Sequence, residues 1–239
     1  MQKKYTHLFF DLDNTLWDFE KNSYDALETV FNHFQISCEK DIDFKLFFKV
    51  YSFHNHQCWQ EYRQGKLSKQ ELVGLRFKKT FEHFNISGID TLQMNNLYLE
   101  NMPMQKRLVE GAHELLSYLK KKGYLLFIIT NGFTEVQHKK LETTGLRQYF
   151  TKIFTSEEIK APKPSRVIFE HAVRSANAKK SSCLMIGDDA EVDILGALSF
   201  GMDAVYLGKE QTINFKPTGK KIIPKFYLIR NLSELQFFL

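Results

Sequence analysis

The chain has 239 residues, 43% of them hydrophobic and 14% aromatic, mostly phenylalanine, with a formal net charge of +5. This length and apolar content suffice for one large domain with a buried core and a second, smaller one, and they exclude a disordered chain. The positive charge favours anionic ligands. Its lysine clusters are scattered, however, so we interpret them as solvated surface groups and expect no stable nucleic-acid partner.

The three cysteines, Cys38, Cys58 and Cys183, form no C-x-x-C pair and are odd in number. We therefore expect reduced thiols in a cytoplasmic protein rather than a disulfide framework. The apolar stretch near the N-terminus is too short for a signal-peptide core, and no run approaches the roughly 20 apolar residues of a membrane span. We expect no membrane partner, and the choice between monomer and homodimer stays open.

The first predicted strand, His7–Phe10, ends abruptly in two carboxylates one residue apart, Asp11 and Asp13. In open parallel α/β sheets, ligands bind at the carboxyl ends of the strands, so both side chains are expected in a catalytic crevice. Because neighbouring carboxylates repel each other, the site should also hold a cation. The alternative for an Asp-x-Asp pattern alone is a solvated loop.

Residues 17–104 are predicted to be almost entirely helical. Apolar residues recur there at helical spacing, at Tyr24, Leu27, Phe31 and Phe34 and again at Phe44, Phe47, Phe48 and Tyr51. The pattern Ser68-x-x-Glu71 predicts a capping box that opens another helix. We expect these helices to form a small bundle, residues 17–104, inserted into a catalytic domain made of residues 1–16 and 105–239.

After the insertion, a helix is predicted from Ala112 to Lys122, ended by Gly123. Strands and helices then alternate to the C-terminus. The runs Tyr124–Ile129 and Cys183–Ile186 are almost continuously apolar, which is typical of strands covered on both faces. The predicted fold is α/β: a doubly wound, Rossmann-like parallel sheet with an inserted all-helical domain.

Polar motifs follow the predicted strands in a characteristic order. They are Asp11-x-Asp13-x-Thr15, Thr130, Lys163, and Gly187-Asp188-Asp189 followed by Asp193. This order resembles the haloacid dehalogenase superfamily of hydrolases and phosphatases. Four segments also look like its noncanonical pyrimidine 5'-nucleotidase subgroup: Ile129–Thr134, Leu141–Leu146, Ser156–Glu158 and Asp193–Gly196. In that family a helical insertion after the first motif is a cap over the active site, and such lids exclude water and select substrates.

The resemblance implies a Mg2+-dependent phosphatase that forms an aspartyl-phosphate intermediate. Asp11 would be the nucleophile that attacks phosphorus. Asp13 would protonate the leaving oxygen and then activate water as a base. Lys163 would bridge Asp11 and the phosphate. The dehalogenases of the family lack an acid at the position of Asp13, so this residue argues against halide chemistry.

The resemblance also implies a metal site. Mg2+ would be held by the carboxylates of Asp11 and Asp188 and by the backbone carbonyl of Asp13, with water completing an octahedron. Thr15 would brace this loop through a hydrogen bond. Asp193 would orient the metal shell or Lys163.

Asp189 departs from the family pattern, which commonly has a small neutral residue there. Two interpretations stay open: an additional metal ligand, or a carboxylate that faces solvent.

For the substrate, the hydroxyl of Thr130 and the backbone of Asn131 would donate hydrogen bonds to the phosphoryl oxygens. The alternative for this Asn-Gly sequence is a simple turn. In the insertion, Trp59 and Tyr62 are candidates to stack on a nucleobase, or else they pack inside the bundle. Two further aromatic candidates lie next to the motifs, Trp17 and Phe133.

His54-x-His56-x-Cys58 has the residue types of a zinc site. On a helix, positions two apart point away from one another, so these side chains do not converge on one ion. We therefore expect no zinc site here.

The leading hypothesis is an enzyme that hydrolyses pyrimidine nucleoside 5'-monophosphates, with a small phosphorylated metabolite as its partner. The alternative is a phosphatase of sugar phosphates or other small metabolites, because the catalytic motifs do not contact the leaving group. A receiver-like signalling module also binds Mg2+ through acidic residues. It needs neither a large cap nor an aspartate two residues after the phospho-acceptor.

Overall fold

The structure, a computed structural model, describes residues 4–37, 42–208 and 223–239. It divides into two compact units, Met1–Phe19 with Lys106–Leu239 (unit 1) and Glu20–Gln105 (unit 2). Trp17 belongs to unit 1, whereas the predicted insertion begins at residue 17. The reason is local pairing: Trp17 forms β-bridges with Asp13 and with Leu108, so the chain leaving unit 1 and the chain returning to it are paired.

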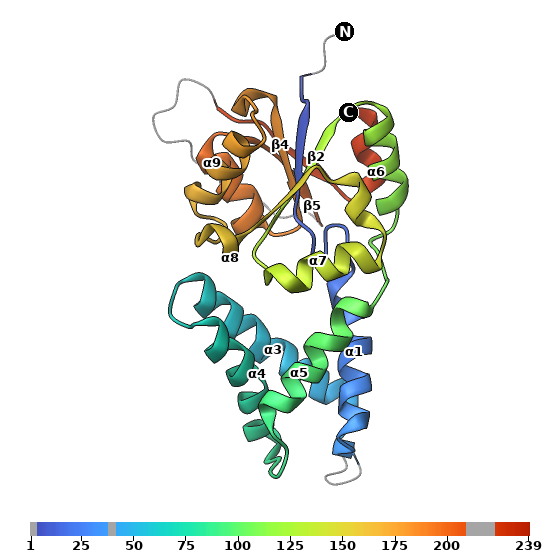
Figure 1. Cartoon of the computed structure of the whole chain (residues 1–239), viewed down its shortest axis with the longest axis vertical. Coiled ribbons are helices and arrows are strands. Elements are labelled where there is room, and N and C mark those ends of the chain that lie inside the picture. Colours follow the sequence, from blue (N-terminus) through green and yellow to red (C-terminus); the bar gives the residue numbers. More distant parts are fainter. Residues whose placement is uncertain (1–3, 38–41, 209–222) are drawn as a thin grey trace. The chain divides into compact units, whose positions relative to one another are not determined.

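Unit 1 is built on a six-stranded parallel sheet with the strand order β3-β2-β1-β4-β5-β6 (Figure 1). The strands are β1 (His7–Phe10), β2 (Leu125–Thr130), β3 (Lys152–Thr155), β4 (Cys183–Gly187), β5 (Asp203–Leu207) and β6 (Phe226–Ile229). This order is that of doubly wound sheets, so the predicted fold class is confirmed. In the register, Phe10 pairs with Ile128 of β2 and with Ile186 of β4. The residues that follow these three strands therefore emerge at one edge of the sheet.

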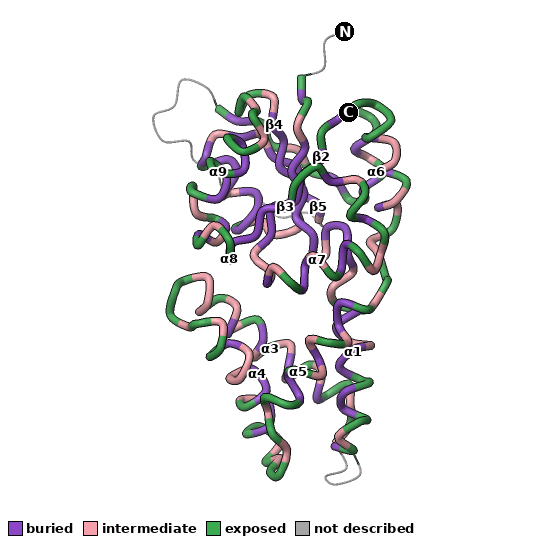
Figure 2. The backbone as a smooth tube through the Cα atoms, in the orientation of Figure 1, coloured by how far each residue is buried: buried purple, intermediate pink, exposed green. Residues whose placement is uncertain are grey.

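Helices cover both faces of this sheet (Figure 1). The helical segments of unit 1 are α6 (Ala112–Lys121), α7 (Thr134–Thr143), η2 (Leu146–Tyr149), α8 (Ser156–Ile159), α9 (Arg166–Ser175), η3 (Lys180–Ser182), η4 (Ala190–Leu195), α10 (Gly196–Phe200) and η5 (Leu232–Phe237). On one face, Phe169 of α9 and Leu198 of α10 share a buried apolar cluster with Phe9 and Phe127. On the other face lies α6, which buries Leu115, Leu116 and Leu119. Figure 2 shows the central strands, β1, β2, β4 and β5, as almost continuously buried, as their apolar sequences predict, whereas β6 at the edge is largely exposed.

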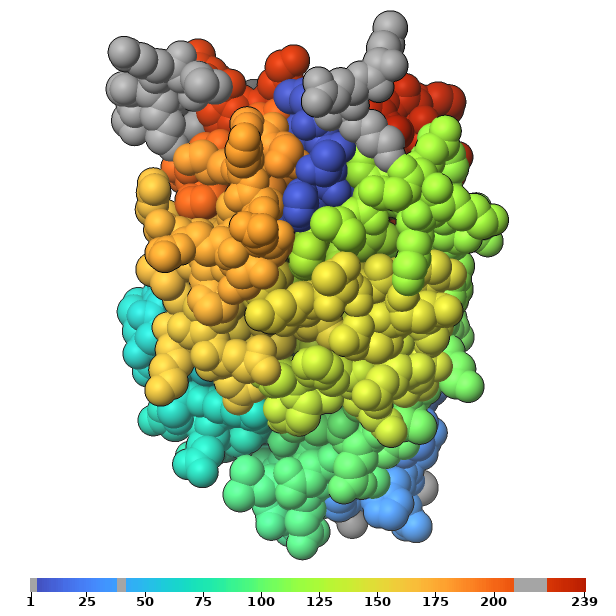
Figure 3. All heavy atoms as spheres, turned by 45° about the horizontal axis from the view of Figure 1, so that its top comes forward, coloured from blue at the N-terminus to red at the C-terminus, as the bar shows by residue number. Residues whose placement is uncertain are grey.

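A polar cluster joins the strands at their amino ends, away from the edge that follows Phe10. Asp203 Oδ2 accepts hydrogen bonds from Tyr5 Oη (2.6 Å) and Lys4 Nζ (2.5 Å). The hydroxyl groups of Tyr5 and Tyr227 are 3.1 Å apart. In Figure 3 the first described residues, in blue, reach the surface between the orange segment before β4 and the green segment before β2.

Unit 2 contains α1 (Phe19–His33), which begins at the last residue of unit 1, and α3 (Phe44–Arg63), α4 (Lys69–Phe84), α5 (Thr91–Asn101) and η1 (Met102–Met104). The predicted capping box is present: Ser68 Oγ accepts from the Glu71 amide, and Glu71 Oε2 accepts from the Ser68 amide. Inside the unit, the Arg76 guanidinium donates to Asn55 and Asn95 and lies against the rings of Tyr51, Phe77 and Tyr98.

Cys58 and Cys183 are buried free thiols, and Cys38 lies outside the described residues. In the described part of the chain, we find no helix with both the length and the apolar character that a membrane span requires.

Candidate active site

Lys163 is a buried cation that joins two carboxylates. It lies between α8 and α9, and its Nζ donates to Asp11 Oδ1 (2.5 Å), Asp193 Oδ1 (2.6 Å) and the carbonyl of Ile129 (2.8 Å). These three bonds use all three hydrogens of the ammonium group. Burial alone lowers the pKa of Lys163, but the charges of Asp11 and Asp193 outweigh it, so the pKa is raised. The side chain is therefore a fixed positive charge beside Asp11.

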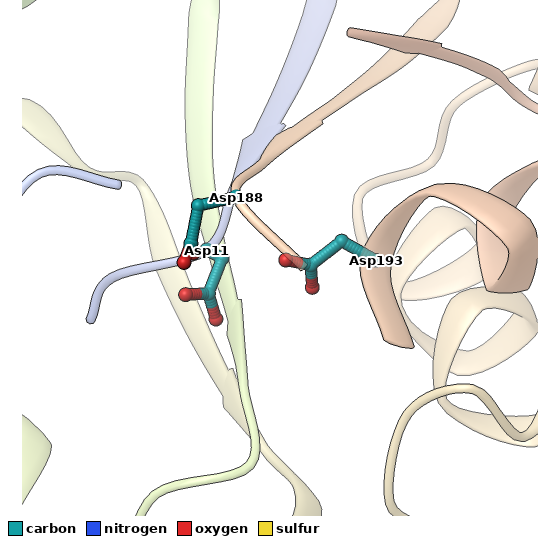
Figure 4. A group of neighbouring side chains, drawn as sticks. All are labelled: Asp11, Asp188 and Asp193. Carbon is teal, nitrogen blue, oxygen red and sulfur yellow. The ribbon is translucent and has the colours of Figure 1, made fainter. Parts of the chain in front are cut away.

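Three carboxylates converge where β1 and β4 end (Figure 4). Asp11, Asp188 and Asp193 each offer an oxygen, and these atoms lie within 4.8 Å of one another. Asp188 Oδ1 accepts a hydrogen bond from Thr15 Oγ1 at 3.0 Å. Burial raises the pKa of Asp11 well above its ordinary range, and it raises the pKa of Asp188 to about 7, with the charge of Asp193 adding to the second shift.

The chemistry of this donor set fits a hard divalent cation. Three carboxylates share one lysine, so their charges are only partly balanced. Mg2+ prefers oxygen ligands, and a cation would relieve the mutual repulsion of Asp11 and Asp188. Across residues 4–37, 42–208 and 223–239, this is the only cluster of three or more acidic, His or Cys side chains that could hold a metal.

Asp13 is held by two side chains of α7. Its Oδ1 accepts from Lys140 Nζ (2.6 Å), and its Oδ2 accepts from Gln137 Nε2 (2.8 Å). The Asp13 side chain is 28% exposed and that of Lys140 only 2%. The ammonium of Lys140 also lies 4.2 Å from the ring centroid of Trp17. Neither Gln137 nor Lys140 was predicted as a site residue.

Thr130 is oriented as a hydrogen-bond donor. Its Oγ1 accepts from Gln137 Nε2 (2.8 Å) and from the amide of Gly132 (3.1 Å). With two donors on its oxygen, the hydroxyl is left to donate its own hydrogen elsewhere. This geometry is what a contact to a phosphoryl oxygen would require.

Asn131 braces the segment that carries Lys163. Its Oδ1 accepts from the Lys163 amide (2.8 Å), and its Nδ2 donates to the Lys163 carbonyl (3.0 Å). The side chain thus fixes the backbone from which the Lys163 ammonium extends. The contact expected from the Asn131 backbone to a phosphoryl oxygen stays a prediction.

Asp189 caps the helical turn that follows β4. Its Oδ1 accepts from the amides of Glu191 and Val192, both at 2.9 Å. Asp193 Oδ2 in turn accepts from the Asp189 amide at 3.2 Å. Oδ1 of Asp189 is therefore held by the backbone of η4, and the two interpretations from the sequence, an additional metal ligand or a carboxylate that faces solvent, stay predictions.

The aromatic candidates lie in different surroundings. Trp17 and Phe133 are buried in unit 1. Trp59 is on α3 of unit 2, where its ring meets Tyr62 edge to face at 5.5 Å. His54, His56 and Cys58 lie on the same helix, as expected.

Comparisons with known proteins place the chain in a family. Residues 5–201 match the family model described as haloacid dehalogenase-like hydrolase. The pyrimidine 5'-nucleotidase PynA of Streptococcus pneumoniae is 35% identical over 205 residues, which cover 84% of this chain and 83% of that protein. The pyrimidine 5'-nucleotidase YjjG of Escherichia coli is 32% identical over 237 residues, which cover 98% and 97%.

A solved structure shows the same fold over the whole length. It is the magnesium-bound crystal structure of the putative HAD-hydrolase YfnB of Bacillus subtilis, with a TM-score of 0.83 and 27% identity over 98% of each chain. The order of the motifs, the parallel sheet and these matches agree, so the chain belongs to the haloacid dehalogenase-like hydrolases.

Proposed function

We propose that this enzyme is a Mg2+-dependent phosphomonoesterase whose preferred substrates are pyrimidine nucleoside 5'-monophosphates. The observation that carries the proposal is the group formed by the buried Asp11, Lys163 and Asp193 with the partly buried Asp188, and with a second aspartate, Asp13, two residues after Asp11. The two relatives named as pyrimidine 5'-nucleotidases support the choice of substrate.

In the proposed reaction, Asp11 attacks phosphorus. Lys163 occupies Oδ1 of Asp11, so we assign the attack to Oδ2. A bond forms between Oδ2 and phosphorus while the bond to the leaving oxygen breaks, and Asp13 gives its proton to that oxygen. Thr130 donates to a phosphoryl oxygen throughout.

The second half-reaction returns the enzyme to its starting state. Asp13, now ionised, takes a proton from a water molecule, whose oxygen bonds to phosphorus as the bond to Asp11 breaks. Asp13 is thereby reprotonated, and inorganic phosphate is released. Bound by Asp11, Asp188 and the Asp13 carbonyl, Mg2+ would supply positive charge that offsets the repulsion between Asp11 and the phosphate dianion.

Selection among substrates needs groups that contact the leaving alcohol. In the proposed reaction, the residues around Asp11 do not contact the leaving group beyond its bridging oxygen, so we assign this selection to unit 2, acting as a cap. Trp59 is our candidate for stacking on the base. Stacking on an aromatic side chain contributes about 1–3 kcal/mol, enough for roughly 5- to 150-fold in specificity.

The test is phosphate release by the purified enzyme across nucleotides and sugar phosphates. We expect kcat/KM for UMP, dUMP or dTMP to exceed that for sugar phosphates by at least about tenfold. If sugar phosphates are hydrolysed faster, the pyrimidine assignment is wrong and the phosphatase assignment stands. If no ester is hydrolysed with Mg2+ present, the phosphatase assignment itself fails. An aspartyl-phosphate that persists for minutes instead of turning over would point to a receiver-like module.

A further inference from the structure

Helix α7 holds both oxygens of Asp13, one with each of two buried side chains. Lys140 donates to Oδ1 and Gln137 to Oδ2, at 2.6 and 2.8 Å. Both donors are almost fully buried, whereas Asp13 is partly exposed. A carboxylate bonded at one oxygen can still swing about that bond. One donor on each oxygen fixes the plane of the group.

Keeping these two side chains buried is unfavourable for folding. A buried ammonium loses its hydration, which its partner and the faces of aromatic rings offset only in part. Gln137 Oε1 is buried without a hydrogen-bond partner among the described residues. A buried carbonyl left in that state destabilises the fold, because it has lost its hydrogen bonds to water without replacement. Apolar side chains at these two positions of α7 would make the folded protein more stable. The benefit of Gln137 and Lys140 must therefore be functional, and the group that both contact is Asp13.

The backbone leaves room for this arrangement at one glycine. A Cβ atom on Gly132 would lie 1.9 Å from Gln137 Nε2 and 2.5 Å from Gln137 Cδ. Gly132 is not among the residues with positive φ, so the requirement for glycine here is steric. The second hydrogen of the same amide goes to Thr130. The side chain of Gln137 thus connects Asp13, the proposed acid, with Thr130, the proposed hydrogen-bond donor to a phosphoryl oxygen.

We propose that Gln137 and Lys140 are positioning residues that hold the Asp13 carboxyl group where it transfers its proton to the leaving oxygen, in the space that Gly132 leaves open. The inference rests on the proposed phosphatase function and extends it to residues outside the sequence motifs. It requires the two residues to act through Asp13, and therefore to matter most when the leaving oxygen needs a proton.

The test compares two esters of similar size with different leaving groups. The p-nitrophenolate ion leaves without protonation, whereas the benzyl alkoxide of benzyl phosphate requires it. We compare kcat/KM because it reports on the steps up to phosphoryl transfer and not on the later hydrolysis of the phosphoenzyme. The variants are Lys140→Met, Gln137→Leu and Gly132→Ala. The matched control is Lys139→Met, which removes an exposed lysine from the same helix.

General acid catalysis contributes typically 10²–10⁴-fold, so we expect each variant to lower kcat/KM for benzyl phosphate at least about tenfold. For p-nitrophenyl phosphate we expect a loss below about threefold for Lys140→Met. Gln137→Leu and Gly132→Ala also disturb the hydrogen bonds to Thr130, so for these two variants the loss on benzyl phosphate should exceed the loss on p-nitrophenyl phosphate at least about threefold. Lys139→Met should match the wild-type enzyme on both esters. Gly132→Ala removes no buried charge, so it tests the inference even if Lys140→Met fails to fold.

A double-mutant cycle with Asp13→Asn separates positioning from other roles. In the Asp13→Asn background, Lys140→Met should cause no further loss on benzyl phosphate, whereas Gly132→Ala should keep only the loss that acts through Thr130 and is equal on both esters. Equal losses on both esters in the enzyme that retains Asp13, or a loss for Lys140→Met that multiplies with that of Asp13→Asn, would overturn the inference while leaving the phosphatase assignment intact. A wild-type enzyme that hydrolyses neither these two esters nor UMP with Mg2+ present would refute the proposed function instead.

Discussion

Asp193 occupies the space that a side chain at position 187 would need: a Cβ atom on Gly187 would lie 2.3 Å from Asp193 Oδ2. Gly187 is the last residue of β4, and Asp193 lies on η4 with its other oxygen 2.6 Å from Lys163 Nζ. The ion pair between Lys163 and Asp193 therefore depends on the absence of a side chain at residue 187, at the end of β4.

Gly187→Ala should displace Asp193 and weaken its ion pair with Lys163. Breaking a buried pair is strongly destabilising, about 3–5 kcal/mol when one partner is removed, so a partial displacement should lower the melting temperature and turnover together. Steady-state phosphate release and thermal unfolding measure the two effects. Wild-type values for both would mean that the ion pair between Asp193 and Lys163 does not depend on a glycine at position 187.

A matched glycine in unit 2 serves as the control. A Cβ atom on Gly74, inside α4, would meet Leu92 Cδ2 at 3.7 Å, an ordinary van der Waals contact. Alanine is favoured over glycine in a helix by roughly 0.5–1 kcal/mol. Gly74→Ala should therefore raise the free energy of unfolding and leave turnover unchanged.

Asp11→Asn should abolish turnover without unfolding the protein. The amide keeps the shape of the side chain, but it loses the nucleophile and one negative charge toward the metal. Circular dichroism would show whether the variant is folded, and phosphate release would measure its activity. Near-normal release would show that Asp11 is not the nucleophile.

The sheet and much of the site follow from the sequence for a physical reason. The segments before Asp11, Thr130 and Asp188 are almost continuously apolar, as strands covered on both faces must be. In a parallel sheet such strands end at one edge, so the polar residues that follow them are brought together. The contact of Lys163 with Asp11 could be predicted only from the family resemblance, because a lysine next to prolines does not by itself indicate a buried catalytic residue.

The residues of α7 show where the sequence is insufficient. A lysine and a glutamine in a short helix are typical of a solvated face, and only the rotation of α7 about its axis turns Gln137 and Lys140 inward. That rotation is set by the packing of Val136 and Leu141, which are buried on the same helix. The N-cap at Asp189, in contrast, could have been predicted from the sequence, because an aspartate directly before a helical apolar pattern is a standard N-cap signal.

Chelation and two neighbouring substitutions test the metal site. EDTA should abolish activity, and Mg2+ should restore it. Asp188→Ala should sharply raise the Mg2+ concentration needed for half-maximal activity, because it removes a proposed ligand. Asp189→Ala should instead lower the free energy of unfolding by about 1 kcal/mol, because it removes the cap of η4, with the Mg2+ requirement unchanged.

Asp189→Asn is the control for this pair, since an asparagine also caps helices and should keep most of the stability. If Asp189→Ala raises the Mg2+ requirement as Asp188→Ala does, Asp189 is a ligand after all. Full activity after exhaustive chelation would exclude the metal-dependent mechanism.

The polar cluster at the amino ends of the strands should make stability depend on pH. Burial alone raises the pKa of Asp203, but hydrogen bonds from Lys4 and Tyr5 outweigh it, so the pKa is lowered. A lowered pKa in the folded state stabilises the protein above the unfolded-state value of about 3.9, and this contribution is lost as the pH falls through the folded-state pKa. Burial and Asp203 raise the pKa of Tyr5, so its contribution is lost as the pH rises above about 10.

Asp203→Asn should therefore lower the free energy of unfolding by about 1 kcal/mol or more near pH 7. The difference from the wild type should shrink at pH 3, where the wild-type carboxylate is also becoming protonated. Urea denaturation at the two pH values measures this. A difference of equal size at both would mean that the charge of Asp203 does not contribute.

Trp59→Ala should reduce the preference for nucleotides without an equal loss of catalysis. If its ring stacks on the base, the loss in kcat/KM should be roughly 5- to 150-fold for UMP, with a much smaller change for p-nitrophenyl phosphate. Phe53→Ala is the matched control, because Phe53 is an aromatic residue of the same helix and is largely exposed. Equal losses on both substrates would mean that Trp59 supports the packing of unit 2 with Tyr62 and does not contact the base.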